Sequence, residues 1–148
     1  MIKTKKMLIT SLFGKRKGFF RKHRGVDIRS VDPGTSARLP VITPENVRID
    51  RIVHQRKWGY TIVASSNESD YTFKFIHIQK IGDIRRGKIV PAGETIAVTA
   101  VTPYMIKNEY WEHLHFEVWR NGKATDPLLY FEKMGFPFEL KSGLVRKT

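Results

Sequence analysis

The sequence lacks cysteine and long apolar runs, and both absences narrow what the protein can be. Without cysteine there are no disulfides or thiolate ligands, so any bound metal must be held by nitrogen and oxygen atoms. No stretch is long and apolar enough to cross a bilayer. The start "MIKTKKMLITSLFGKRK" has basic residues on both sides of its apolar run and no small-residue cleavage site. We therefore expect no secretory signal peptide.

Acidic residues are also scarce. The chain has 14 Asp and Glu against 27 Lys and Arg, a formal net charge of +13, and no acid precedes Asp27. Such a balance favours polyanionic surroundings, such as nucleic acid, an anionic membrane surface or a bacterial wall. The length of 148 residues suits one domain with a real core.

Short β-like runs dominate the chain, and clusters of Gly, Pro, Asn, Asp or Ser separate most of them. This spacing predicts a mostly β single domain with antiparallel sheets in a barrel-like or sandwich-like arrangement. One short C-terminal helix is expected after Asp126, with Pro127 in its first turn and Gly135 as its left-handed stop. Residues 136–148 either pack on the domain or dock onto a partner. The runs are 25–31, 46–54, 60–65, 71–78, 87–90, 95–101 and 113–120.

The stretch "EHLHFEV" carries two histidines on one face of a predicted strand. Because side chains alternate along a strand, His113, His115 and Glu117 share a face. The apolar residues between them share the other face, which can enter the core. The two histidines are either ordinary half-exposed side chains or a pair that faces a metal.

A second polar pair lies upstream in "HRGVDI", where His23 and Asp27 are four residues apart. Val26 and Ile28 alternate around Asp27, so the carboxylate points away from the core face. Taken alone, Asp27 is interpreted as a surface acid beside a basic cluster.

A further histidine lies in "FKFIHIQ". His77 is expected to share a face with Phe73 and Phe75, while Ile76 and Ile78 face the other way. Such a histidine among aromatic residues is most simply a core residue. His54 has no accompanying pattern and is assigned no role.

Together these residues suit metal-assisted hydrolysis. Two imidazoles and a carboxylate are a ligand set for Zn²⁺ that leaves a fourth position for water. A bound zinc ion lowers the pKa of that water and polarises a carbonyl. Two further imidazoles nearby could accept the proton of the water and stabilise an oxyanion.

The order of the motifs resembles the lysostaphin-type zinc endopeptidases, which cleave peptides in bacterial peptidoglycan. The similarity runs from about Phe13 to Tyr130, and its most specific part is the ending "HLHFEVWRNGKATDPLLY". The other matching segments are "FGKRKGFFRKHRGVDI", "DPGTSARLPV", "WGYTIVAS", "YTFKFIHI" and "IRRGKIVPAGETIAV".

The resemblance implies that His23, Asp27 and His115 bind zinc, that His113 is the general base and that His77 stabilises the tetrahedral intermediate. It also implies an open groove over one sheet. The predicted organisation is a basic N-terminal extension (1–12), a zinc endopeptidase domain (13–135) and a C-terminal tail (136–148).

One segment departs from the family pattern. Residues 101–112 contain no glycine, where the family has a glycine-rich loop beside the substrate groove. The substrate-binding residues and the scissile bond, in a stem peptide or a cross-bridge, are therefore not predicted, and this segment could restrict or block the groove.

Two other functions are weighed against the enzyme. The first is a catalytically silent wall-binding or structural module of the same fold, and the second is a basic nucleic-acid-binding protein. The ordered histidines favour the enzyme, with peptidoglycan and no specific nucleic acid as its partner.

The source of the protein is a separate expectation. A compact lytic domain without a signal peptide suits a bacteriophage virion component in contact with other tail proteins. A lysis enzyme released from the host cytoplasm, or a bacterial enzyme exported by an unusual route, is the alternative source.

Overall fold

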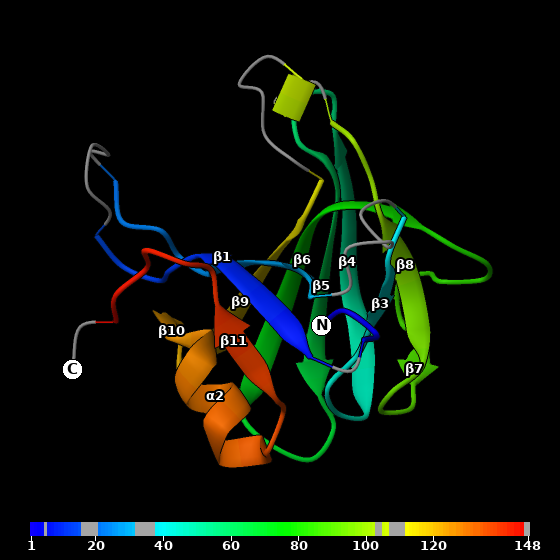
Figure 1. Cartoon of the computed structure of the whole chain (residues 1–148). Helices are drawn as coiled ribbons and strands as arrows, with labels where there is room; N and C mark the ends of the chain where they lie inside the picture. The colour runs from blue at the N-terminus through cyan, green and yellow to red at the C-terminus, as the bar shows by residue number, and fades with distance from the viewer. Residues whose placement is uncertain (5, 16–20, 32–37, 103–104, 107–111, 147–148) are drawn as a thin grey trace.

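The strands form one mixed sheet that does not close on itself. The computed structural model describes residues 1–4, 6–15, 21–31, 38–102, 105–106 and 112–146. The strands pair in the order β11-β1-β2-β9-β6-β5-β4-β7, while β10 pairs with β9, and β8 pairs with β3 and β6 (Figure 1). The elements are β1 (Met7–Ser11), β2 (Val26–Ser30), β3 (Pro40–Ile42), β4 (Val47–Gln55), β5 (Gly59–Ser66), β6 (Tyr71–Lys80), β7 (Ile89–Val90), β8 (Thr95–Thr99), β9 (Leu114–Arg120), β10 (Lys123–Thr125), α2 (Pro127–Met134) and β11 (Phe138–Leu140).

This architecture confirms the predicted mostly β class with a short C-terminal helix. Every pair in the sheet is antiparallel except β1 with β11, which is parallel. Each predicted run contains a strand, but β1, β3, β10 and β11 were not predicted. Three of these four are only three residues long, too short to show a period.

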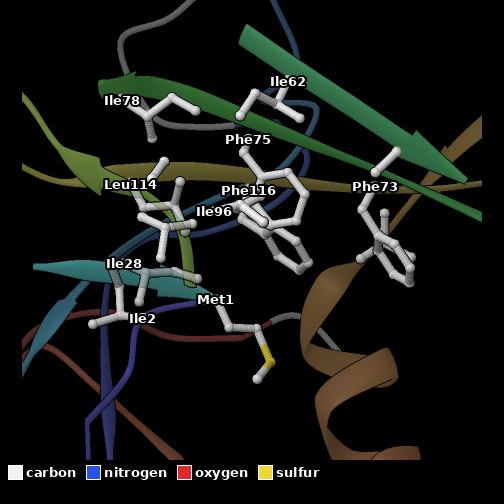
Figure 2. Close-up of a cluster of buried hydrophobic side chains, with 14 of the residues drawn as sticks. Met1, Ile2, Ile28, Ile62, Phe73, Phe75, Ile78, Ile96, Leu114 and Phe116 are labelled. Atoms are coloured by element: carbon white, nitrogen blue, oxygen red, sulfur yellow. The ribbon is translucent and has the colours of Figure 1, made fainter. Parts of the chain in front are cut away.

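The core lies on one face of the central strands β2, β9, β6 and β5. Phe73 and Phe75 of β6 and Phe116 of β9 are fully buried. The Phe116 ring lies 6.0 Å from the Phe73 ring and 5.3 Å from the Phe75 ring, between ring centroids (Figure 2). Burying each of these side chains contributes roughly 1.5–3 kcal/mol. The opposite face of β2 and β9 is thereby left for polar groups.

Helix α2 has the predicted ends. The Asp126 side chain accepts a hydrogen bond from the backbone N–H of Leu128, and Gly135 takes the left-handed conformation at φ 79°. Its buried face includes Phe131, whose ring stacks on Phe116 of β9 with centroids 5.7 Å apart. The helix therefore covers the aromatic core at the end of β9 that follows Phe116.

The N-terminal residues and strand β11 pack on the domain. Met1 and Ile2 are buried in the core, and β1 pairs with β11 of the C-terminal segment (Figures 1 and 2). Residues 138–140 therefore pack on the domain itself, which decides between the two alternatives for this segment. The limits 1–12, 13–135 and 136–148 stay a prediction. Within the described residues, no helix is long and apolar enough to span a membrane.

Candidate metal centre

Strand pairing places Asp27 beside His115. The two residues are directly opposite each other in the antiparallel pair of β2 and β9. Their neighbours Val26, Ile28 and Phe116 are fully buried on the core face. Because side chains alternate, the carboxylate and the imidazole must emerge together on the other face.

His23 reaches the same point because the chain before β2 passes close to β9. A Cβ atom on Gly25 would lie 2.2 Å from the backbone oxygen of Phe116, so only glycine fits there. His23 exchanges two backbone hydrogen bonds of 2.8 Å with Gly14. Its Nδ1 atom donates to the Leu12 carbonyl at 2.9 Å, so the Nε2 lone pair is available for a metal.

The three predicted ligand atoms form a nearly regular triangle. His23 Nε2 lies 3.1 Å from His115 Nδ1 and 3.3 Å from Asp27 Oδ1, and the third edge, His115 Nδ1 to Asp27 Oδ1, is 3.1 Å. Ligand distances of about 2.0–2.1 Å around tetrahedral zinc give edges of roughly 3.3–3.4 Å. The donor set therefore fits a zinc ion in both chemistry and spacing.

Glu117 supports this triangle from the side remote from the other two ligands. His115 Nε2 lies 2.8 Å from Glu117 Oε2, and Trp119 Nε1 donates to Glu117 Oε1 at 2.7 Å. With the Nε2 proton held by a carboxylate, the Nδ1 atom of His115 is the one that can bind a metal. Alternation along β9 predicts that Glu117 lies on the histidine face, but the sequence pattern alone gives it no role.

In the metal-free site, His115 holds a proton tightly between two carboxylates. Burial lowers the pKa of His115, but hydrogen bonds to Asp27 and Glu117 outweigh burial and raise it to about 9. Burial raises the pKa of Asp27, yet bonds to His115 and His23 hold it well below its usual value. A metal cation would replace the shared proton, so metal binding should release protons.

The two remaining predicted histidines lie next to the triangle. His113 Nε2 is 3.6 Å from Asp27 Oδ1, and the ring centroids of His77 and His113 are 5.2 Å apart. His77 Nδ1 donates to the carbonyl of Trp58 at 3.2 Å. Burial, followed by the charges of His113 and His115, lowers the pKa of His77 to about 4, which keeps this ring neutral.

His77 does not share the face of Phe73 and Phe75, and this prediction was wrong. Its φ angle is +66°, in the left-handed region, and the β5–β6 register shifts next to it. β6 pairs with β9 up to Ile76 and with β8 from Ile78 onwards. This bulge reverses the alternation, so Ile78 joins the core (Figure 2). The His77 ring instead lies next to the His113 ring.

His54 lies apart from this group. It is exposed on β4, and its ring lies 4.6 Å from the Tyr60 ring. The segment 101–112, predicted to border the groove, falls largely outside the described residues. Of its described members, Glu112 accepts a hydrogen bond from the backbone N–H of Arg38 at 3.2 Å.

Three ligand atoms on an open β-sheet, with two imidazoles beside them, are the equipment of a metal-dependent hydrolase. Comparison with known proteins gives the family. The model of peptidase family M23 matches residues 21–127, and the chain belongs to this family of metallopeptidases.

Relatives and solved structures agree with this assignment. An uncharacterized metalloprotease of Haemophilus influenzae is 32% identical over 111 residues, which are 75% of this chain and 21% of that protein. The chain thus spans about a fifth of that relative. LytU superposes with a TM-score of 0.70 at 25% identity, over 84% of each chain. The catalytic domain of the antimicrobial peptidase lysostaphin from Staphylococcus simulans superposes with a TM-score of 0.64 at 22% identity, over 82% of this chain and 89% of that one.

Proposed function

We propose that this protein is a zinc endopeptidase that hydrolyses peptide bonds of bacterial peptidoglycan. The observation that carries the proposal is the triangle of His23 Nε2, Asp27 Oδ1 and His115 Nδ1, with edges of 3.1–3.3 Å. Membership of family M23 supports the metallopeptidase activity. Peptidoglycan as the substrate is supported by the resemblance to lysostaphin-type enzymes and by the net charge of +13, which favours an anionic wall.

In this proposal His23, Asp27 and His115 hold the zinc ion. The ion supplies Lewis-acid activation of water and of the scissile carbonyl when it is bound. Glu117 and the Leu12 carbonyl keep the rings of His115 and His23 in the tautomers that present the ligand nitrogen. Both imidazole ligands are thus fixed by a second contact before any metal binds.

His113 and His77 would move the protons. In the roles that the resemblance implies, His113 takes a proton from the attacking water and returns it to the leaving amine. His77 would stabilise the oxyanion of the tetrahedral intermediate through Nε2, because its Nδ1 proton is held by Trp58. The Nε2 atom of neutral His77 is an acceptor, so His77 must gain a proton there before it can stabilise an oxyanion. The same geometry makes His77 a second acceptor for the proton of the water.

The test is zinc content measured together with the release of soluble fragments from purified peptidoglycan. His115→Ala should bind no stoichiometric zinc, and its hydrolysis should fall by at least about 10⁴-fold because water activation is lost. His54→Ala replaces an exposed histidine outside the site and should retain both. Full hydrolysis by His115→Ala would overturn the proposal. Binding to peptidoglycan without turnover by the zinc-loaded wild type would point to a silent wall-binding module.

A bacteriophage source, with the enzyme in the virion tail or released for lysis, stays a prediction from the sequence. Mass spectrometry of purified virions tests it: the protein should be present at a stoichiometry typical of a structural component. Its absence from virions would leave the lysis enzyme or an exported bacterial enzyme.

A further inference from the structure

Among the described residues, three acidic groups around the candidate metal centre are engaged within the protein. Asp27 contacts His23 and His115, Glu117 accepts from His115 and Trp119, and Glu112 accepts from the backbone of Arg38. The Glu112 and Glu117 side chains are buried, and the Asp27 side chain is only 15% exposed. These carboxylates therefore present little negative charge to a substrate.

The exposed charges on one border of the centre are cationic. Arg21, Lys22 and Arg24 flank the predicted ligand His23, and all three are exposed. The backbone bridge between His23 and Gly14 holds this segment in place. Two of the three cations are covalent neighbours of a residue in the metal triangle.

The opposite border is cationic as well. The β4–β5 turn carries Arg56 and Lys57, both exposed, and its Trp58 carbonyl accepts from His77. The Lys57 ammonium lies 4.7 Å from the centroid of the Trp58 ring, which is 5.8 Å from the His77 ring. This hydrogen bond and these ring contacts tie the basic turn to the candidate catalytic pair.

Two exposed acids lie in the next turn along the chain, at the far end of β5. Glu68 and Asp70 are in the turn between β5 and β6, beyond the far end of β5. The eight residues of β5 separate the two turns by about 25 Å. Asp70 is paired with Arg120, whose Nε atom lies 2.9 Å from Asp70 Oδ1, and Glu68 accepts a hydrogen bond from Asn46. These two acids are therefore far from the histidines and are engaged where they lie, whereas the turn beside the histidines carries two cations.

From this distribution we infer that the peptide cleaved carries a free carboxylate next to the scissile bond, on a residue bound at the border formed by Arg24 or at the border formed by Arg56. This inference rests on the proposed function and specifies its substrate. A guanidinium pairs with a carboxylate in bidentate geometry, whereas a neutral peptide such as a glycine cross-bridge offers it no partner. Cations at both borders would also raise the rate of encounter with anionic peptides.

The experiment compares three synthetic cross-linked stem peptides of one sequence. The first has all carboxylates free, the second has its side-chain carboxylates converted to amides, and the third has only its terminal carboxylate converted. We expect kcat/KM of the zinc-loaded enzyme to fall about fivefold to twentyfold for one of the amides, the effect of a few exposed ion pairs. The amide that shows the fall identifies whether the carboxylate is terminal or on a side chain.

Variants locate the effect. In the double variant Arg24→Gln/Arg56→Gln the ratio of kcat/KM between the carboxylate and amide peptides should approach one, and the two single variants separate the borders. Arg86→Gln/Lys123→Gln removes the same charge from exposed positions elsewhere and should keep the wild-type ratio.

The outcomes separate the two proposals. Equal cleavage of all three peptides by the wild type would overturn the carboxylate preference and leave the endopeptidase standing. A preference that both double variants reduce equally would also overturn it, because net charge alone would then explain it. Cleavage of none of the peptides, nor of intact peptidoglycan, would count against the proposed function itself.

Discussion

Strands β9 and β6 lie side by side, and each supplies a histidine to the candidate site in a different way. β9 keeps the regular alternation: Leu114, Phe116 and Val118 enter the core, and His115 emerges on the other face. β6 keeps it only as far as Ile76, and His77 reaches the site through a left-handed backbone. The comparison shows that one histidine comes at no conformational cost and the other requires a strained residue.

The two histidines also differ in their electrostatic surroundings. His115 contacts the carboxylates of Asp27 and Glu117, whereas the Nδ1 atom of His77 donates to the neutral carbonyl of Trp58. The first environment favours a cationic ring or a bound cation, and the second favours a neutral ring. In the proposed function, the metal-ligand position and the proton-transfer position would thereby lie on adjacent strands.

The largest expected difference is in proton affinity. In the metal-free protein His115 should titrate with a pKa of about 9 and His77 with a pKa of about 4, measured by NMR of ¹⁵N-labelled imidazoles. If both rings titrated near pH 6.5, the predicted difference between their pKa values would be wrong.

The same pKa values predict how stability depends on pH. His115 should stabilise the metal-free fold fully below pH 6.5, and this contribution should be lost as the pH rises through 9. The pKa of His77 is lowered, so it should destabilise the fold as the pH falls from 6.5 toward 4.

The next largest expected effect is a difference between alanine variants of the two histidines. His77→Ala should retain zinc, unlike His115→Ala, while kcat falls by about 10²- to 10³-fold because a proton-transfer or oxyanion group is lost. Zinc content and kcat are measured on the same preparation, with His54→Ala as the control. Loss of zinc from His77→Ala would place His77 among the ligands instead.

Glu117→Gln tests whether Glu117 supports the ligand histidine on β9, a support that His77 on β6 does not need. The amide has one acceptor oxygen for two donors, His115 Nε2 and Trp119 Nε1, so the ring of His115 loses part of its support. Zinc affinity should fall about 10- to 100-fold, measured by competition with a chelator. Glu112→Gln changes a carboxylate that accepts from the Arg38 backbone and should leave the affinity within a fewfold of wild type. Equal affinity of wild type and Glu117→Gln would exclude the supporting role.

The smallest effect tests the strain at His77 directly. His77→Gly should be more stable than His77→Ala by about 1 kcal/mol, because glycine adopts φ +66° without a Cβ clash. The same pair at His115, in regular β conformation, should show the reverse order by about 0.5–1 kcal/mol. Urea unfolding of the four metal-free variants measures both differences. The same order at both positions would show that β6 relaxes without its histidine.

Local patterns in the sequence were sufficient for much of the fold and part of the site. Alternation predicted the core face of β9 and the outward position of Asp27, and cap residues predicted both ends of α2. The supporting role of Glu117 could have been found, because Glu117 shares the histidine face of the same strand. The bulge at His77 could not, because no glycine or proline marks it and nothing local favours a left-handed histidine there.

The residue types by themselves determined that only nitrogen and oxygen ligands are available, that the protein is strongly basic and that its strands carry histidines on a polar face. Tertiary structure decided which atoms meet: β2 pairs with β9 in a register that puts Asp27 opposite His115, and Gly25 lets His23 approach. It also decided which face of the sheet His77 occupies, because β6 changes its partner from β9 to β8 at this residue and the local alternation is interrupted. Register and partner choice depend on contacts between distant segments, and these form only when the whole sheet assembles.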